Sequence, residues 1–224
     1  MYFKKKLFSF YILLILLFLL LFTISFNLSA ISNEILVDKI VAVVGDTVIS
    51  FSDIEKAVLL YPILRNSNES EIEFYKQILN ELIDYRIIYL EYGNGIILNE
   101  NDFEKIELEI IEKSGSFQKL NTILNAFDMT WENFRVFIKE RVFFEKTIKE
   151  KFQFKISISF NDVKQFYKKE YVPNQKKMNL IPKSLIEMTP KIENHLRQIE
   201  TGKKIKSWIK DIRDKYKIRI LSKI

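Results

Sequence analysis

The pattern of apolar and polar residues divides the chain into an apolar leader and a longer remainder of mixed polarity. Three lysines, Lys4 to Lys6, precede a stretch from Leu7 to Phe22 that is almost entirely Leu, Ile, Phe and Tyr, and no charged residue occurs between Leu7 and Asn33. From Glu34 onward, apolar and charged residues recur with the periods of helices and strands. The leader and the remainder therefore need separate interpretations.

The leader is typical of a secretory signal, because it has a basic start, an apolar middle and a small residue, Ala30, after which cleavage is expected. Its apolar run of about 16 residues is long for a signal and short for a membrane span of roughly 20. An uncleaved anchor over residues 1–30 is the alternative. Both interpretations place the remainder in the periplasm, outside the cytoplasm.

Strand signals occur at both ends of the remainder. Lys39 to Val44 and Thr47 to Ser50 are β-rich and are joined by Gly45-Asp46, a composition that favours a two-residue type II′ hairpin. The residues from Tyr216 to Ile220 alternate with the period of a strand. Because an isolated strand is unstable, we expect it to pair with the hairpin and to join the two ends of the chain in one small sheet.

Helical patterns begin directly after the hairpin. Ser52 and Glu55 have the spacing of a capping box, which predicts a helix from Asp53 to Tyr61. From Glu71, apolar residues recur at helical spacing until Gly93 ends the helix. The stripe needs cover on more than one side and consists of Ile72, Tyr75, Leu79, Leu82, Arg86 and Leu90, widened by Ile78, Ile83 and Ile87.

Three further helices are predicted before residue 160. The first runs from Asp102 to Lys113, with a cap at Asn99 or Asn101, a stop at Gly115, and Phe103, Ile106, Ile110 and Ile111 facing inward. The second runs from Ser116 to Ala126 around Leu120 and Leu124. The third is capped by Thr130 and carries Trp131, Phe134, Ile138, Val142, Ile148 and Phe152 at helical spacing.

The last third of the chain contains a break in the helical pattern. Asn161-Asp162 is predicted to cap a helix that ends at Tyr171, before Pro173, and the polar, lysine-rich residues from Asn174 to Lys183 are predicted to form a loop. Pro190 is expected to begin the closing helix. Its apolar positions, which continue beyond Gly202, are Ile192, Leu196, Ile199, Ile205, Trp208, Ile209 and Ile212.

Few residues are suited to catalysis. The chain has no cysteine, which excludes disulfides, thiolate zinc sites and a cysteine nucleophile, and it has a single histidine, His195, interpreted as a surface or packing residue. The acidic residues Glu104, Glu107, Glu109 and Glu112 alternate with apolar positions and are interpreted as a solvated helix face. No nucleotide-binding loop occurs. We therefore expect neither enzymatic activity nor a metal or other cofactor.

The net charge gives little support for nucleic acid as a partner. The formal charge of +6 includes the three lysines of the leader, so the remainder is nearly balanced. An exported destination separates the protein from genomic DNA and from most RNA. The remaining unusual property is an excess of apolar, aromatic helix face, which is explained either by an ordinary core or by a groove that binds apolar polypeptide segments.

A series of short motifs runs in one order from about Val37 to Tyr171. It comprises Val37 to Ser50, Ser52-Asp53-Ile54, Leu79 to Ile83, Tyr92, Gly95-Ile96-x-Leu98, Gly115-Ser116-Phe117, Trp131-x-x-Phe134-Arg135, Arg141, Ser159 to Val163 and Phe166-Tyr167. In order and spacing this series resembles SurA-type periplasmic chaperones and their foldase relatives. Trp208 to Arg213, followed by a strand from Lys217 to Leu221, resembles the closing segment of the same family.

One departure from the family matters for function. The family usually inserts one or two parvulin-type prolyl isomerase domains before its closing segment, whereas residues 172–187 here offer only a short loop. The resemblance therefore implies a chaperone core without isomerase activity. Its expected parts are a signal or anchor over residues 1–30, a helical chaperone core over residues 31–171, the loop over residues 172–187, and a helix and strand over residues 188–224 that complete the core.

The expected fold class is mainly α, an irregular multi-helix domain with a small antiparallel sheet. The expected function is that of an ATP-independent periplasmic holdase for unfolded exported or outer-membrane proteins. An anchored structural or assembly subunit that binds one fixed partner is the alternative. Flat aromatic and flexible Met side chains suit a broad binder, and the candidate client-binding residues are Tyr75, Tyr89, Phe117, Phe127, Met129 and Trp131.

Cleavage after Ala30 is the first testable expectation. Amino-terminal sequencing of the exported protein should yield a chain that begins at Ile31, because a small residue follows the apolar run there. A protein that still contains Met1 and is found only in membranes would support the anchor instead.

Overall fold

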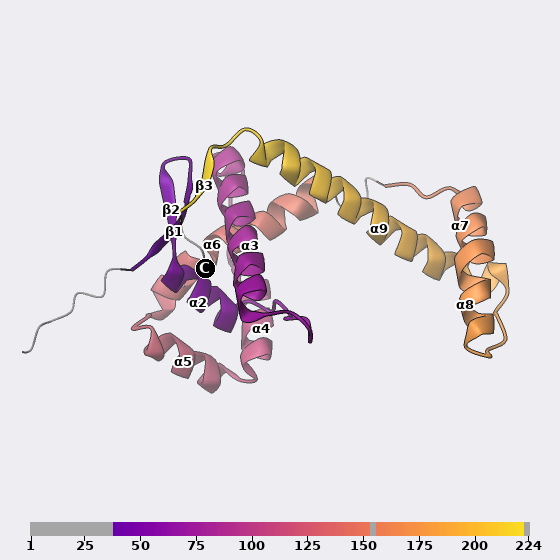
Figure 1. Ribbon diagram of the computed structural model, residues 1–224, viewed down its shortest axis with the longest axis horizontal. Coiled ribbons are helices and arrows are strands. Elements are labelled where there is room, and N and C mark those ends of the chain that lie inside the picture. Colours follow the sequence, from indigo (N-terminus) through magenta and orange to yellow (C-terminus); the bar gives the residue numbers. More distant parts are fainter. Residues whose placement is uncertain (1–37, 153–155, 222–224) are drawn as a thin grey trace, which may run out of the picture. The chain divides into compact units, whose positions relative to one another are not determined.

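A computed structural model describes residues 38–152 and 156–221, and it is mainly helical with one small antiparallel sheet (Figure 1). This is the fold class that the sequence predicts. The leader, its expected cleavage site after Ala30 and residues 31–37 lie outside the described residues. The residues from Asp38 onward form one unit.

The sheet contains strands β1 (Ile40–Val44), β2 (Thr47–Ser50) and β3 (Ile218–Ile220), in the order β2-β1-β3. The turn between β1 and β2 is formed by Gly45 and Asp46, as predicted. Gly45 has a φ of +58° and Asp46 keeps a negative φ, which fits a type II′ turn and explains the glycine at its first position.

The carboxyl-terminal strand returns to the start of the fold. Strand β3 pairs antiparallel with β1, and Val44 lies opposite Ile218. The amide of Gly45 donates to the carbonyl of Lys217 at 3.1 Å, and the amide of Leu221 donates to the carbonyl of Val41 at 2.9 Å. The predicted pairing of the two chain ends is therefore confirmed.

Five helices follow the hairpin. They are α2 (Phe51–Leu60), α3 (Glu71–Tyr92), α4 (Glu100–Ser114), α5 (Phe117–Ala126) and α6 (Trp131–Phe152). Helices α2 and α3 pack directly against the sheet. Helices α3 and α6 pack along each other, and α4 packs on both α5 and α6. The buried core combines side chains of the sheet with the inward faces of these helices, including Val41, Val44, Ile54, Ile78, Ile87, Ile106, Ile110, Leu120, Leu124, Phe134, Ile138 and Phe143.

Helix α2 begins two residues before the predicted position. Ser50, not Ser52, is its amino-terminal cap: the Ser50 hydroxyl accepts from the amide of Asp53, and the Asp53 carboxylate accepts from the amide of Ser50. The hydroxyl of Ser52 donates to Asp38 at 2.5 Å instead. The cap moves because the strand β2 delivers the chain to the helix with Ser50 already extended.

The buried face of α3 also differs from the predicted stripe. Phe74, Tyr85 and Ile88 are buried although the stripe omitted them, whereas Ile72 and Leu90 are exposed. Helix α3 contacts α2, α6, α9 and strand β1. The buried face is therefore determined by several neighbours, and a single stripe cannot describe it.

The boundaries of α4, α5 and α6 follow the predictions closely. Asn99 caps α4 within a capping box, and Gly115 ends it with a φ of +87°, a conformation that favours glycine. The hydroxyl of Thr130 accepts from the amide of Asn133 at 3.1 Å at the start of α6. Leu120 and Leu124 are the buried residues of α5, as expected.

The helix predicted to end before Pro173 continues beyond it. Ser159, rather than Asn161-Asp162, caps α7 (Phe160–Phe166), which leads through the π-helical turn η1 (Tyr167–Tyr171) into α8 (Val172–Lys177). The amide of Val172 donates to the carbonyl of Tyr167, five residues back. This wider turn accommodates Pro173, which has no amide proton to donate.

The closing helix is longer than predicted. Helix α9 (Leu185–Arg213) begins after the cap Ser184 and contains Pro190 in its interior, so Pro190 does not start it. Pro190 has no amide proton to donate to the carbonyl of Ile186, so the helix lacks one backbone hydrogen bond at this turn. The loop predicted over residues 172–187 is thereby confined to residues 178–184. Across residues 38–152 and 156–221, no helix is both long and apolar enough to cross a membrane.

Removal of residues 217–224 should destabilise the fold. The truncated chain loses the ladder between β3 and β1, the two backbone hydrogen bonds that flank it and the packing of Ile218. At about 0.5–1.5 kcal/mol for each hydrogen bond, we expect its free energy of unfolding to fall by at least roughly 2–4 kcal/mol. Denaturant titration monitored by circular dichroism measures this change.

A deletion of residues 222–224 alone is the matched control, because it leaves β3 intact. Equal unfolding midpoints for the two truncations would show that the pairing of β3 with β1 contributes nothing to stability.

Candidate functional site

Helix α9 is held on the core by its carboxyl-terminal half. The guanidinium of Arg213 donates to the carboxylate of Asp84 on α3 at 2.6 Å and to the carbonyl of Asn80 at 3.1 Å. Burial raises the pKa of Asp84, and the charge of Arg213 opposes this rise. Trp208 packs against Tyr92 of α3, with ring centres 5.7 Å apart. This end of α9 is therefore fixed by charge and by aromatic packing.

The amino-terminal half of α9 packs against α7 and η1 rather than against the core. Ile192 of α9, Val163 of α7 and Ile156 are buried there. The Nε of Arg197 donates to the carbonyl of Ile156 at 3.3 Å, which holds the chain before α7 on the helix. The exposed ring of His195 lies 5.3 Å from that of Phe166, so His195 is a surface packing residue.

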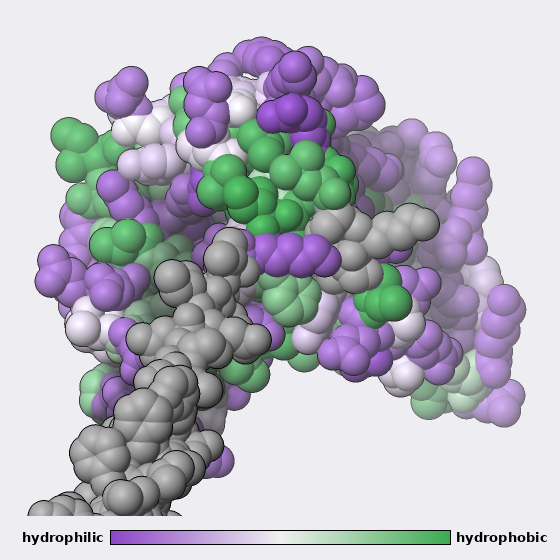
Figure 2. Space-filling model, turned by 60° about the vertical axis from the view of Figure 1, so that its left-hand side comes forward, coloured by the Kyte–Doolittle hydropathy of each residue, from purple (hydrophilic) through white to green (hydrophobic). Residues whose placement is uncertain are grey.

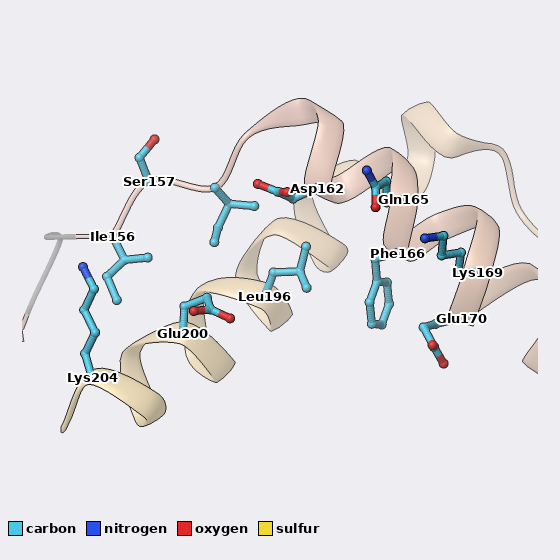
Figure 3. Close-up of a pocket in the computed structure, with 11 residues that line it drawn as sticks. Ile156, Ser157, Asp162, Gln165, Phe166, Lys169, Glu170, Leu196, Glu200 and Lys204 are labelled. Atoms are coloured by element: carbon cyan, nitrogen blue, oxygen red, sulfur yellow. The ribbon is translucent and has the colours of Figure 1, made fainter. Parts of the chain in front are cut away.

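An open groove of about 580 Å³ lies between α9 and the segment from Ile156 through η1 (Figure 3). We call it the α7 groove. In Figure 3, Leu196 rises from α9 between Ile156 on one side and Phe166 on the other. Ile158 completes its apolar lining. Its rim is charged with mixed sign and consists of Asp162, Lys169, Glu170, Glu200 and Lys204.

A second open groove, of about 660 Å³, lies between α9 and the end of α6. We call it the α6 groove. Ile148 and Phe152 of α6 and Ile205 of α9 supply its apolar lining. Gly202 lies in its wall, and a methyl group built there would meet no atom within 4 Å. The glycine thus widens the groove at the position where a side chain would otherwise project.

Neither groove holds a constellation suited to acid–base or nucleophilic catalysis. Their polar groups are Lys, Arg, Glu, Asp, Asn, Gln, Ser and Thr side chains on open rims, and His195 does not line them. In the part of the chain that the structure describes, no cluster of His, Asp and Glu side chains is arranged to hold a metal ion. The chemistry available is contact with apolar groups, bordered by charge.

A smaller, partly open pocket of about 240 Å³ lies between β2, α2, α3 and α6. Tyr61, Tyr85 and Phe137 line it, together with Arg86 and Glu140, whose Nε and Oε1 are 2.6 Å apart. Burial raises the pKa of the Glu140 carboxyl, and the hydrogen bond from Arg86 opposes the rise. The stacked rings of Tyr61 and Phe137 and this ion pair hold the surrounding helices together.

The two arginines in the motifs of α6 have structural roles. Arg135 donates to Glu107 at 2.6 Å, and Arg141 donates to Glu109 at 2.6 Å while its guanidinium lies over the ring of Tyr61. The prediction of a solvated acidic face on α4 was therefore wrong for Glu107, which is buried, and for Glu109, which is partly covered. The reason is that α6 supplies a positive partner to each carboxylate.

The six residues predicted to bind clients do not gather in one place. Tyr75 packs edge-on against Phe51 at 5.9 Å, and Tyr89 packs against Phe143 at 5.4 Å. Phe117 and Trp131 meet at the start of α5 and α6, with ring centres 5.7 Å apart. Phe127 and Met129 are partly buried in the turn between these helices. The two grooves beside α9 are lined by other residues.

Sequence reasoning identified Leu196, Ile205 and Phe152 as apolar helix positions but did not assign them to a binding surface. The sequence contained a signal for these residues, because α9 carries apolar residues on both sides of Gly202. A mid-helix glycine lowers helix stability, which suggests that its lack of a side chain serves another purpose. In the sequence, Phe166 stands out only as part of the motif Phe166-Tyr167. The path of α7 along α9 could not be inferred from the sequence.

Apolar side chains also reach the surface in patches among the charged ones on the face that Figure 2 shows. Isolated exposed apolar side chains are normal for a soluble domain. The grooves differ from them because several apolar side chains converge on one open space.

The comparisons with known proteins give a structural likeness. No family model matches the chain, and no curated protein sequence matches it. A solved structure matches with a TM-score of 0.47 and 13% identity, over 82% of this chain and 99% of the other. It comes from work describing the virulence factor PEB4 and the periplasmic protein Cj1289 of Campylobacter jejuni as two structurally related SurA-like chaperones. At this identity and TM-score, the likeness assigns neither a family nor a function to the chain.

Proposed function

We propose that the protein is an ATP-independent periplasmic chaperone that holds apolar or aromatic segments of unfolded exported or outer-membrane polypeptides. The observation that carries this proposal is the pair of open grooves, the α7 groove and the α6 groove, on the two sides of one helix. The resemblance of the motif series from Val37 to Tyr171 to SurA-type chaperones supports the same function.

The form of the grooves suits weak and broad binding. Their volumes of about 580 and 660 Å³ fall in the range of ligand sites, but both are open to solvent, and side chains rather than fixed polar donors line them. A client side chain that is fully buried contributes about 1.5–3 kcal/mol, so several partial contacts give roughly micromolar affinity. Such an affinity allows a client to be released without ATP.

The mature protein should suppress the aggregation of a denatured β-barrel protein at near-stoichiometric ratio without ATP. Light scattering after dilution of the client from denaturant measures the effect. The variant Gly202→Glu should suppress much less, because its carboxylate enters the α6 groove and must lose water when an apolar segment binds. Leu196→Gln should act in the same way in the α7 groove.

Gly202→Ala is the matched control. Alanine meets no neighbouring atom, stabilises the helix by roughly 0.5–1 kcal/mol and leaves the groove apolar, so suppression should persist. Equal suppression by the Glu and Ala variants would remove the α6 groove from the proposal. An absence of suppression for every client, together with tight binding to one folded protein, would support the assembly subunit instead.

We also propose that the protein is not an enzyme. Purified protein should not accelerate cis–trans exchange in a proline peptide, because its polar groups form no acid–base site around the grooves. His195→Ala should leave aggregation suppression unchanged, since His195 lies on the surface beside the ring of Phe166 and lines neither groove. Catalytic acceleration at substoichiometric protein would contradict this prediction.

A further inference from the structure

The loop between α8 and α9 and the first turn of α9 carry apolar side chains that project into solvent. Ile181 is 92% exposed, Ile186 is 86% exposed, Met178 is 67% exposed and Leu180 is 53% exposed. We call these four residues the apolar tip. Neither groove described above includes them. Exposed apolar residues concentrated within nine positions of sequence need an explanation that scattered surface residues do not.

The backbone that carries the tip is held in a defined conformation. Helix α8 ends in a Schellman motif: the amide of Leu180 donates to the carbonyl of Gln175 at 2.9 Å, the amide of Asn179 donates to that of Lys176 at 3.0 Å, and Asn179 has a φ of +56°. This arrangement turns the chain directly after the helix. The tip is therefore presented on an ordered turn.

Two tyrosines of η1 hold the far side of the same loop. The hydroxyl of Tyr167 donates to the carbonyl of Lys183 at 2.7 Å, and the amide of Lys183 donates to the hydroxyl of Tyr171 at 3.3 Å. The two tyrosine rings stack with their centres 5.5 Å apart. Because both ends of the loop are fixed, the loop loses little conformational freedom when the tip binds to another surface.

Lysines outnumber acidic residues along the segment that carries the tip. Residues 172–186 contain three lysines, Lys176, Lys177 and Lys183, and no acidic residue. Lys183 forms an exposed pair with Glu187 at 2.8 Å, whereas Lys176 and Lys177 have no acidic partner among the described residues. Projecting apolar side chains beside unpaired lysines are the combination that binds an anionic lipid surface, where the apolar groups enter the acyl boundary and the amines remain at the headgroups.

We propose that the apolar tip inserts into the interface of a phospholipid bilayer that carries anionic headgroups, and that Lys176 and Lys177 provide its charge selectivity. An anionic bilayer fits these observations better than a protein partner, because the lysines match its headgroup charge and singly projecting side chains enter it without a complementary pocket. This inference goes beyond the proposed chaperone function and does not depend on it.

The absence of cysteine allows a local measurement on the full chain. Ile181→Cys is labelled with an environment-sensitive fluorophore, and vesicles are added that contain either phosphatidylcholine alone or phosphatidylcholine with phosphatidylglycerol. The label reports the environment of its own position, so its emission shifts only if residue 181 itself enters the bilayer. Blue-shifted emission is expected with the phosphatidylglycerol vesicles and little change with phosphatidylcholine alone.

Ile97→Cys is the matched control. Ile97 is 87% exposed on the surface between α3 and α4, and it lies outside the lysine-rich loop. Its label should not shift with either vesicle. The double change Lys176→Gln and Lys177→Gln in the Ile181→Cys chain should weaken the vesicle affinity by about ten- to thirtyfold, since each lysine near an anionic surface contributes roughly 1 kcal/mol.

Three results would overturn the proposal. One is an unchanged Ile181→Cys emission with phosphatidylglycerol vesicles, and another is an equal shift with both vesicles. The third is a shift produced only by an unfolded polypeptide, which would make the tip part of a client surface. Suppression of aggregation is measured without lipid, so a failure of the proposed chaperone function can be distinguished from a failure of the tip to bind vesicles.

Discussion

The pairing of β3 with β1 is the constraint on which the remainder of the fold depends. Strand β1 contributes Val41, Ala42 and Val44 to the fully buried core, and it has hydrogen-bonding partners on both sides only because residues from the end of the chain return to it. This return determines where α9 ends. The ion pair of Arg213 with Asp84 then fixes the last turn of α9 on α3.

The length of α9 has a direct consequence. Its 29 residues extend about 43 Å at 1.5 Å per residue, whereas the contacts with α3 and α6 involve mainly its carboxyl-terminal half. The other half is available to α7 and η1, which cover only part of its apolar surface. The two grooves are the uncovered remainder, so they follow from a helix that is longer than its packing on the core requires.

Ion pairs between helices, some of whose charges are buried and others partly exposed, help to fix the arrangement of the helices. Arg135 and Arg141 on α6 pair with carboxylates of α4, and Arg86 on α3 pairs with Glu140 of α6. Removing one member of such a pair leaves the other charge without compensation in a poorly hydrated place, which costs more than the pair contributes. The arginines within the resemblance to SurA-type chaperones are thus explained by packing, and they provide no independent support for a shared function.

Local sequence signals were enough to predict the secondary structure and the closing strand, whereas long-range packing could not be predicted from them. Helix periods, Gly45-Asp46, Gly115 and the alternation of Ile218 and Ile220 predicted the fold class, most elements and the closing strand, because caps, turns and periodicity depend on residues that are near in sequence.

The tertiary structure decided which apolar faces remain uncovered. Tyr89 and Trp131 were assigned to a groove and pack instead beside the core, while Leu196 and Ile205 line open grooves. Similarly, the cap of α2 moved to Ser50 and the helix through Pro173 continued, because the adjoining strand and a π-helical turn altered the local geometry. Exposure depends on which segment lies against a face, and residues distant in sequence supply that segment, so periodicity shows that a helix has an apolar face but not whether another element covers it.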